Sequence, residues 1–229
     1  MKGYGNDAKL IYNKIKYHLP EAVSLAGAID MYRYYFGSKR FVAVPEDSRE
    51  GRRLILANAI AMNYGYAYRL MMFLRIADAF AAVTGRDKKT ISLARDISHN
   101  SIQKDLVNGK QVWIHRHNAC RVMPGTMTVL PGYNTTSSYV CEGIDNAQAS
   151  LCSAPHGAGD SIARYVDAGL SKKRDDEYTT IYQGDGADPV RVDHYTDEGV
   201  DSVVRLLERE RIMRPLVKLT PLATLKDYH

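Results

Sequence analysis

The stretch Ser153-Ala154-Pro155-His156-Gly157-Ala158-Gly159 places a histidine directly before two closely spaced glycines. The residues that follow, Ser161–Leu170, have the pattern of a helix. Glycine lets a backbone approach a ligand closely, and a helix start directs unpaired amide groups outward, so the stretch suits an anion held beside an imidazole. A tight turn around a buried structural histidine explains the same residues equally well. We therefore predict a turn into a helix, with His156 as its candidate chemical centre.

The sequence before this turn predicts a long helix. Asp47 and Glu50 have the spacing of a capping box, and the Ala-, Leu- and Met-rich sequence that follows predicts a helix to about Val83. Gly85 is placed to end it. Because apolar residues lie on most of its circumference, we expect this helix to be largely buried.

From Gln111 onward the pattern changes to short strands and turns. Strands are predicted at Val112–Ile114, Thr126–Leu130 and Ser138–Cys141, with turns at Pro124-Gly125 and Pro131-Gly132. The charged run Lys172–Glu177 predicts a solvated loop, and Val200–Ile212 predicts a final amphipathic helix. The fold class is therefore α+β: a long buried helix, short strands and a helix that starts after the turn at His156. We find no repeat or clear linker, so a single domain over residues 1–229 is predicted.

Composition sets broad limits on function. The 229 residues are 45% hydrophobic and 25% charged, which indicates a globular protein with ample core. A net charge of +5 permits an anionic partner such as RNA or a nucleotide. The three cysteines include no CxxC pair, and the N-terminus lacks the apolar core of a signal peptide. Charged residues interrupt the most apolar stretch, Leu54–Val83, so we predict a cytoplasmic protein without a membrane span.

His115-Arg116-His117 is a second candidate cluster, at the end of the strand predicted from Val112. Alternation along a strand would place both histidines on one face and Arg116 on the other. Imidazoles at a strand end suit metal ligation, although a hydrogen-bonded structural histidine gives the same pattern.

Taken in order, these motifs resemble the RtcB-type RNA ligase family. Asp96-Ile97-Ser98-His99-Asn100 resembles the family's D-[VI]-[SA]-H-N motif, and the segment from Val112 to Arg121 resembles its VHRKGATR element. The segment from Pro131 to Val140 resembles PGSMGTSSYV, and His156-Gly157-Ala158-Gly159 with Arg164 resembles HGAGRxMSR. Pro221-Leu222 with Lys226 is similar to the C-terminal PL-x-x-x-K. The resemblance begins near residue 41, in Val42-Ala43-Val44-Pro45 and the helix around Asn63, and runs to the end; residues 1–40 diverge.

This resemblance implies a chemistry and a set of site residues. Ligases of this family join RNA ends that carry a 3′-phosphate or 2′,3′-cyclic phosphate to 5′-hydroxyl ends, using GTP and Mn²⁺. It implies that His156 attacks the α-phosphorus of GTP and carries GMP, that His115 is a manganese ligand, and that the backbone of Gly157, Ala158 and Gly159 cradles the phosphate. Ser138 and Lys226 would contact the guanine, and Tyr195 would pack on it. For Lys226 a solvated lysine near the chain end is the alternative.

The chain also departs from the family's pattern. The family carries most metal ligands in its N-terminal half, in D-x-G-C, G-N-H-F and G-x-G-H elements. The first two have no counterpart here, and Asn6 stands where the third has histidine. Near the turn, Asp160, Pro155 and Tyr133 replace the family's arginine, cysteine and serine, and His117-Asn118 replaces Lys-Gly. A carboxylate at Asp160 would repel bound phosphates.

Three functions remain open at this point. The chain could be the C-terminal subunit of a split RNA ligase, whose missing ligands come from an N-terminal partner chain. It could be a catalytically degenerate member that binds RNA or a nucleotide, or that acts in assembly. As a weaker alternative, His115 and His156 could bind a metal for another phosphoryl or hydrolytic reaction.

Overall fold

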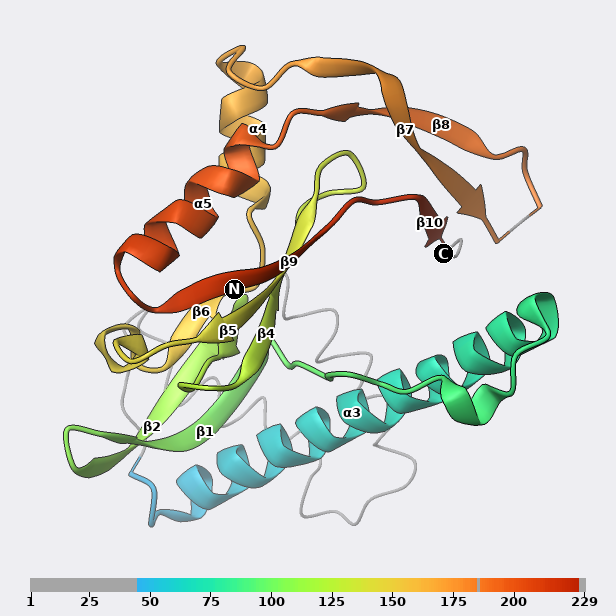
Figure 1. Cartoon of the computed structure of the whole chain (residues 1–229). Coiled ribbons are helices and arrows are strands. Elements are labelled where there is room, and N and C mark those ends of the chain that lie inside the picture. Colours follow the sequence, from blue (N-terminus) through green and yellow to red (C-terminus); the bar gives the residue numbers. More distant parts are fainter. Residues whose placement is uncertain (1–44, 185, 227–229) are drawn as a thin grey trace. The chain divides into compact units, whose positions relative to one another are not determined.

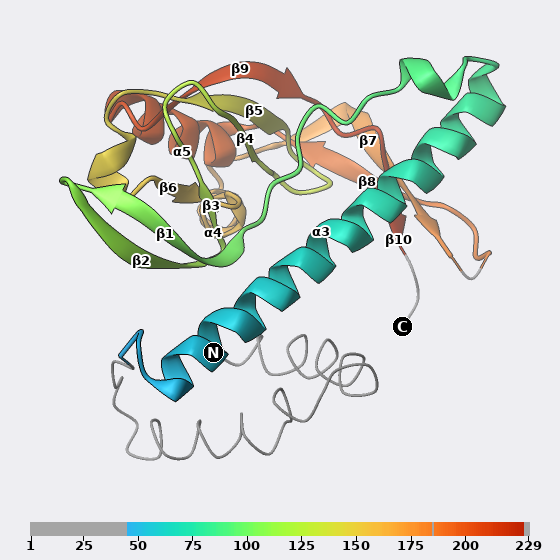
Figure 2. The same ribbon diagram turned by 90° about the horizontal axis from the view of Figure 1, so that it is seen from below.

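The computed structural model describes residues 45–184 and 186–226, and the chain divides into two compact units, Met1–Leu93 and Ala94–His229. Figures 1 and 2 show the elements of each unit from two directions. Helices and strands are mixed, as the α+β prediction expects. Asn6 and the segment Val42–Val44 lie outside the described residues.

The described part of the first unit consists of a long helix and one short turn of helix. Helix α3 (Arg49–Thr84) begins after Ser48, whose Oγ accepts a hydrogen bond from the Gly51 N–H at 2.9 Å. Ser48, and not Asp47, is therefore the N-cap, because its hydroxyl reaches the third residue of the helix. Gly85 ends the helix in the left-handed conformation, which confirms its predicted role. The 3₁₀ helix η2 (Lys88–Thr90) follows.

The expectation that this helix would be largely buried is wrong. Tyr68, Met71 and Ile76 are 56%, 61% and 58% exposed. Among the described side chains of the helix, Ala77 is buried, and apart from Gly51 the others are partly or fully exposed. A 36-residue helix is about 54 Å long. Among the described residues of its own unit, the other regular element is the three-residue η2, which is too short to cover it. Apolar content shows that a helix can be buried, but not which element covers it.

The second unit contains ten strands, two helices and a short 3₁₀ helix among its described residues. The strands are β1 (Asn100–Val107), β2 (Lys110–His117), β3 (Ala119–Arg121), β4 (Met127–Leu130), β5 (Ser138–Gly143), β6 (Ser153–Pro155), β7 (Lys173–Gln183), β8 (Val190–Tyr195), β9 (Met213–Leu219) and β10 (Ala223–Lys226). The helices are α4 (Gly159–Asp167), α5 (Glu198–Arg209) and the 3₁₀ helix η3 (Ala147–Ser150). The predicted strands, the helix after His156 and the final helix are all present.

The strands form four small sheets. β1 and β2 make an antiparallel hairpin, β3 pairs with β6, β5 lies between β4 and β9, and β7 lies between β10 and β8. Only the β10–β7 pair is parallel. The prediction of a loop at Lys172–Glu177 is wrong, because most of this run belongs to β7. The pairing of β7 with β8 shifts between Lys173 and Tyr178, and the charged side chains lie on this irregular, largely exposed part of the strand.

The core of this unit lies where α4 and α5 pack together and α5 packs on β9, as Figure 1 shows. It includes Leu130, Cys141, Val200 and Met213, all at most 1% exposed. At the helix contact, a Cβ on Gly199 would lie 2.7 Å from the Ile162 Cα, so only glycine allows this approach. Because Ile162 is near the start of α4, this packing holds the helix start, and thus the turn after His156, in place.

Candidate functional site around His156

Backbone hydrogen bonds hold His156 at the end of β6. β6 pairs with β3, with Pro155 opposite Ala119, and the His156 N–H donates to the Asn118 carbonyl at 2.9 Å. The Ala119 N–H donates to the His99 carbonyl at 3.0 Å, and the Asn118 N–H donates to Asn100 Oδ1 at 3.0 Å. Segments far apart in the sequence are thus tied together beside one histidine.

The imidazole of His156 contacts two other side chains. Its ring stacks on the ring of His99, with centroids 3.8 Å apart and planes inclined by 10°. Its Nδ1 lies 3.8 Å from the Sγ of Cys120, a fully buried residue. Burial lowers the pKa of His156, so the neutral form, which is the nucleophilic one, persists to lower pH than for a free histidine. Because Nδ1 faces the thiol, Nε2 is the ring nitrogen left for chemistry.

The glycine-containing turn leads from His156 into α4. The Ala158 N–H donates to the Pro131 carbonyl at 3.1 Å, and Ala158 is the N-cap residue of α4 without a side-chain cap hydrogen bond. The first amides of the helix are therefore free of a side-chain cap, as an anion at this end requires. Gly159 packs against Tyr133, whose Oη would lie 2.7 Å from an added Cβ. The exposed Asp160 brings a negative charge to the same turn of helix.

The loop from Pro131 to Ser138 lies against this turn and is closed by Ser138. Its Oγ accepts from the Gly132 N–H at 3.0 Å. The buried Asp197 also anchors this loop: its carboxylate accepts hydrogen bonds from the Ser137 N–H at 2.8 Å and from the Ser137 hydroxyl at 2.9 Å. Burial acts to raise the pKa of Asp197, but hydrogen bonds from Lys218 and Ser137 outweigh it and lower the pKa. A charged, fully bonded carboxylate thus fixes the loop.

The other residues expected at the site are placed less closely. The Tyr195 N–H donates to the Thr135 carbonyl at 2.8 Å, which puts the end of β8 beside the same loop. Lys226 lies exposed on β10, opposite Gln183 of β7. His115 lies on β2 opposite Ile102, on the exposed face that it shares with His117, while Arg116 is buried; the predicted alternation is confirmed. Among the described residues, no hydrogen bond or ring contact joins His115 or Lys226 to His156, whose side-chain contacts are with Cys120 and His99.

Two neighbours of His156 were not identified from the sequence. His99 belongs to a quoted motif, but nothing local to it indicates a stack on His156. Cys120 stands where the VHRKGATR motif has threonine, and the absence of CxxC spacing gave no reason to single it out. Both contacts depend on the long-range pairing of β3 with β6.

The described residues do not form a manganese site by themselves. Residues 45–184 and 186–226 contain no group of three or more His, Cys, Asp or Glu side chains that could hold a metal ion. The parallel stack of His99 and His156 also directs the in-plane nitrogen lone pairs of the two rings along separate planes, so the two do not converge on one ion. These side chains fit single ligands that a larger donor set would complete.

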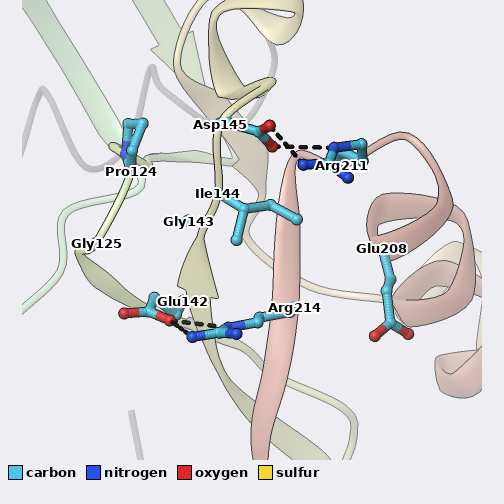
Figure 3. A pocket seen from close by; sticks show the side chains of 9 residues that line it. All are labelled: Pro124, Gly125, Glu142, Gly143, Ile144, Asp145, Glu208, Arg211 and Arg214. Carbon is cyan, nitrogen blue, oxygen red and sulfur yellow. Dashed lines mark hydrogen bonds and ion pairs between the residues drawn. The ribbon is translucent and has the colours of Figure 1, made fainter.

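A surface hollow of about 630 Å³ lies apart from these residues, between β5, the start of β9 and α5 (Figure 3). Its charged lining is mostly self-neutralised: Arg211 binds Asp145 through two nitrogens, at 3.1 and 2.5 Å, and Arg214 binds Glu142 at 2.9 and 2.6 Å. Size alone would favour this hollow as a binding site. The reactive imidazole and the uncapped helix start favour the surroundings of His156 instead.

Comparison with known proteins identifies the family of this chain. The sequence pattern of the family described as tRNA-splicing ligase RtcB matches residues 13–227. The chain therefore belongs to the RtcB family, and the turn at His156 lies inside the matched region. Among the described residues, no helix is both long and apolar enough to cross a membrane.

Individual relatives match at low identity. The RNA-splicing ligase RtcB of Mycobacterium tuberculosis is 27% identical over 226 residues, covering 87% of this chain and 50% of the relative. The tRNA-splicing ligase RtcB of Aeropyrum pernix is 28% identical over 145 residues, covering 55% and 30%. That of Nanoarchaeum equitans is 24% identical over 226 residues, covering 85% and 46%. The chain thus spans about half the length, or less, of these relatives.

Proposed function

We propose that this chain supplies the guanylate-accepting half of a cytoplasmic RNA ligase, which joins an RNA 3′-phosphate or 2′,3′-cyclic phosphate to a 5′-hydroxyl with GTP and Mn²⁺. One observation carries the proposal: His156, half-buried and favoured as the neutral form, stands beside a helix start without a side-chain cap. The names of the relatives, which are RNA-splicing ligases, and the net charge of +5 support RNA as the substrate.

The proposed reaction is a sequence of phosphoryl and nucleotidyl transfers. The Nε2 lone pair of His156 attacks the α-phosphorus of GTP, the N–P bond forms, and the bond from that phosphorus to the leaving pyrophosphate breaks. The GMP then passes to the RNA 3′-phosphate, and the 5′-hydroxyl displaces it. The backbone of Gly157, Ala158 and Gly159 would hold the phosphate, although the Ala158 N–H, which donates to the Pro131 carbonyl at 3.1 Å, would first have to give up that partner. Ser138, Tyr195 and Lys226 would contact the guanine.

Manganese would supply Lewis-acid stabilisation of phosphate charge when bound. This chain would contribute His115 to its ligands, and the described residues do not complete a donor set. We therefore propose that an N-terminal ligase-half partner, carrying the D-x-G-C and G-N-H-F elements, provides the remaining ligands. The isolated chain is then expected to form no stable His156–GMP adduct and to ligate no RNA.

The test is guanylylation of the chain alone and of the complex purified with it from its native host. Each is incubated with α-labelled GTP and Mn²⁺, and a His156→Ala version serves as control. We expect label only on the complex, lost in His156→Ala, together with ligation of an RNA ending in a 2′,3′-cyclic phosphate. Label on the pure chain would refute the need for a partner. A preparation without a chain bearing the two elements, and without label, would refute the ligase proposal.

One observation favours a second candidate, a degenerate member that binds RNA or a nucleotide without catalysis. Asp160 places a carboxylate in the first turn of α4, where bound phosphates would lie. On this alternative, the complex would bind GTP or RNA in equilibrium measurements but carry no label. Binding without label in the native complex would select the alternative, and label on His156 would exclude it.

A further inference from the structure

The segment from β9 to β10 carries the most exposed large apolar side chains of the second unit. Leu222 and Leu225 are 81% and 80% exposed, whereas the next such side chain in the described part of this unit, Leu106, is 60% exposed. Three more exposed apolar side chains lie shortly before them on β9: Leu216, Val217 and Leu219. Figure 1 shows that β9 leads directly into β10. Single exposed apolar residues are ordinary, but a group of this density marks an interaction surface.

The strand pairing explains why the side chains of β10 are uncovered. β10 is the edge strand of the sheet β10–β7–β8, and its parallel register sets Leu225 beside Tyr182 of β7, which is 46% exposed. The neighbouring pair, Thr224 and Ile181, points to the opposite face, where Ile181 is 8% exposed. One face of this sheet is therefore buried. The other presents leucine and tyrosine where a solvated sheet face normally carries polar residues.

β9 adds a free edge to this surface. Among the described residues, β9 pairs with β5 alone, so its other edge has no strand partner. Val217 and Leu219 lie two residues apart on one face of β9 and are 51% and 48% exposed. An edge strand that presents apolar side chains can pair with another polypeptide, and soluble proteins usually protect such edges. Residues 216–226 therefore offer both the side chains and the backbone edges of a docking surface.

We propose that residues 216–226 form the surface on which the N-terminal ligase-half partner docks. The inference rests on the proposed function, which supplies this partner. The relatives from Mycobacterium tuberculosis and Nanoarchaeum equitans match this chain over 50% and 46% of their own length, so each contains about as much polypeptide again without a counterpart here. Lys226, which is expected to contact the guanine, follows Leu225 on β10. A partner docked on this segment therefore lies beside a residue of the nucleotide site that it has to complete.

The chemistry of this surface favours a protein over RNA or a second copy of the chain. Leu222 and Leu225, its most exposed side chains, bury apolar area but offer neither a charge for a phosphate nor a ring for a base. The nearby Lys218 is already paired with the buried Asp197, at 2.8 Å. A second copy would again lack the D-x-G-C and G-N-H-F elements, so it would not complete the metal site.

The test measures how much of the companion chain is retained by tagged versions of the full chain expressed in the native host. Mass spectrometry identifies the companion by its D-x-G-C and G-N-H-F elements. The double variant Leu222→Gln/Leu225→Gln makes the surface polar without adding charge, and Leu106→Gln, on β1, is the matched control for an exposed leucine. We expect the double variant to retain roughly tenfold less companion than the wild type. Leu106→Gln should retain the same amount as the wild type.

Hydrogen exchange gives a second readout that needs no variant. We expect the backbone amides of residues 213–226 to exchange more slowly in the wild-type complex than in the pure chain. The double variant should keep the urea midpoint of the wild type, because both leucines are at least 80% exposed. If it does not fold, the exchange measurement and Leu222→Gln alone, which lies outside β10, still decide the question.

Several outcomes would overturn the docking surface. Equal retention by the double variant, without protection of residues 213–226, would overturn it and leave the partner itself in place. Absence of any companion with the two elements would overturn both. A wild-type dimer in light scattering that the double variant loses would assign the surface to a second copy. Loss of single-stranded RNA binding in the double variant, with the companion retained, would assign it to RNA. Because retention is measured without GTP, a complex that forms but carries no label would refute the ligase reaction and not this surface.

Discussion

Replacing Arg116 by methionine should destabilise the second unit far more than a comparable change on the surface. The Arg116 side chain is 1% exposed and bonds Asp105 Oδ2 at 2.5 Å and Ser153 Oγ at 2.9 Å. It also donates to the carbonyls of residues 151 and 152, at 3.1 and 3.2 Å. Through these bonds, one side chain ties the β1–β2 hairpin to the strand that ends at His156.

The magnitude follows from what the substitution leaves behind. Methionine fills much of the volume but offers no donor, so the Asp105 carboxylate, also 1% exposed, keeps only Arg121 as an ionic partner. Removing one member of a buried ion pair costs about 3–5 kcal/mol, because the remaining charge is desolvated without compensation. Ser153 and the two carbonyls lose donors as well. We expect a loss of about 3–5 kcal/mol in the free energy of unfolding.

Urea denaturation followed by fluorescence of Trp113, the chain's single tryptophan, measures this loss, because Trp113 lies on β2, the strand that carries Arg116. The matched control is Arg211→Met, which breaks an Arg–Asp ion pair with the same shortest distance of 2.5 Å but with side chains that are 67% and 64% exposed. We expect its midpoint to stay close to that of the wild type. Equal midpoints for Arg116→Met and Arg211→Met would refute the assignment of Arg116 as the anchor.

Three further outcomes are expected. Gly132→Ala should cost about 1–3 kcal/mol, since its Cβ would lie 2.1 Å from the Ser137 carbonyl oxygen. Gly159→Ala meets only side-chain atoms of Tyr133, the hydroxyl at 2.7 Å and the ring at 3.1 and 3.2 Å, which can move away, so it should cost less in the same denaturation assay. An NMR titration of His156 should give a pKa below 6.5, because burial disfavours the charged ring. The stability linked to this group is then present above pH 6.5 and decreases as the pH falls through the lower, folded-state pKa. A midpoint at or above 6.5 would contradict the burial argument. In the native complex, Asp160→Asn should tighten GTP binding measured by calorimetry, because it removes a negative charge from the start of α4, and unchanged affinity would separate Asp160 from the phosphate site.

Local sequence signals correctly predicted the helix ends and turns that are set by one or two neighbouring residues. The glycine at position 85 ended the helix as expected, and the turns at Pro124-Gly125 and Pro131-Gly132 bounded strand β4. β1 was missed because Asn100–Val107 alternates imperfectly, and most of the charged run 172–177 was read as a loop although it lies in β7. A partly exposed strand needs few apolar residues, so composition does not distinguish it from a loop.

The contacts around His156 show a different limit. His156 itself was identified from its glycines, and the resemblance supplied roles for Ser138, Tyr195 and Lys226 that stay predictions. No periodicity could pair His99 with His156 or direct Cys120 at Nδ1, since both contacts arise from the β3–β6 register. Side-chain partnerships across distant strands depend on tertiary packing, which a single sequence does not reveal.

The described residues hold the candidate nucleophile in place, but they do not provide all the groups that would activate its substrate. Residues of the second unit make all the contacts that hold His156: the hydrogen bond to the Asn118 carbonyl, the stack with His99 and the contact with the Cys120 thiol. The described residues nevertheless provide no complete set of metal ligands. A histidine can thus be held in a reactive orientation while the charge stabilisation it needs is supplied by other protein. This division explains why we expect guanylylation only in the complex.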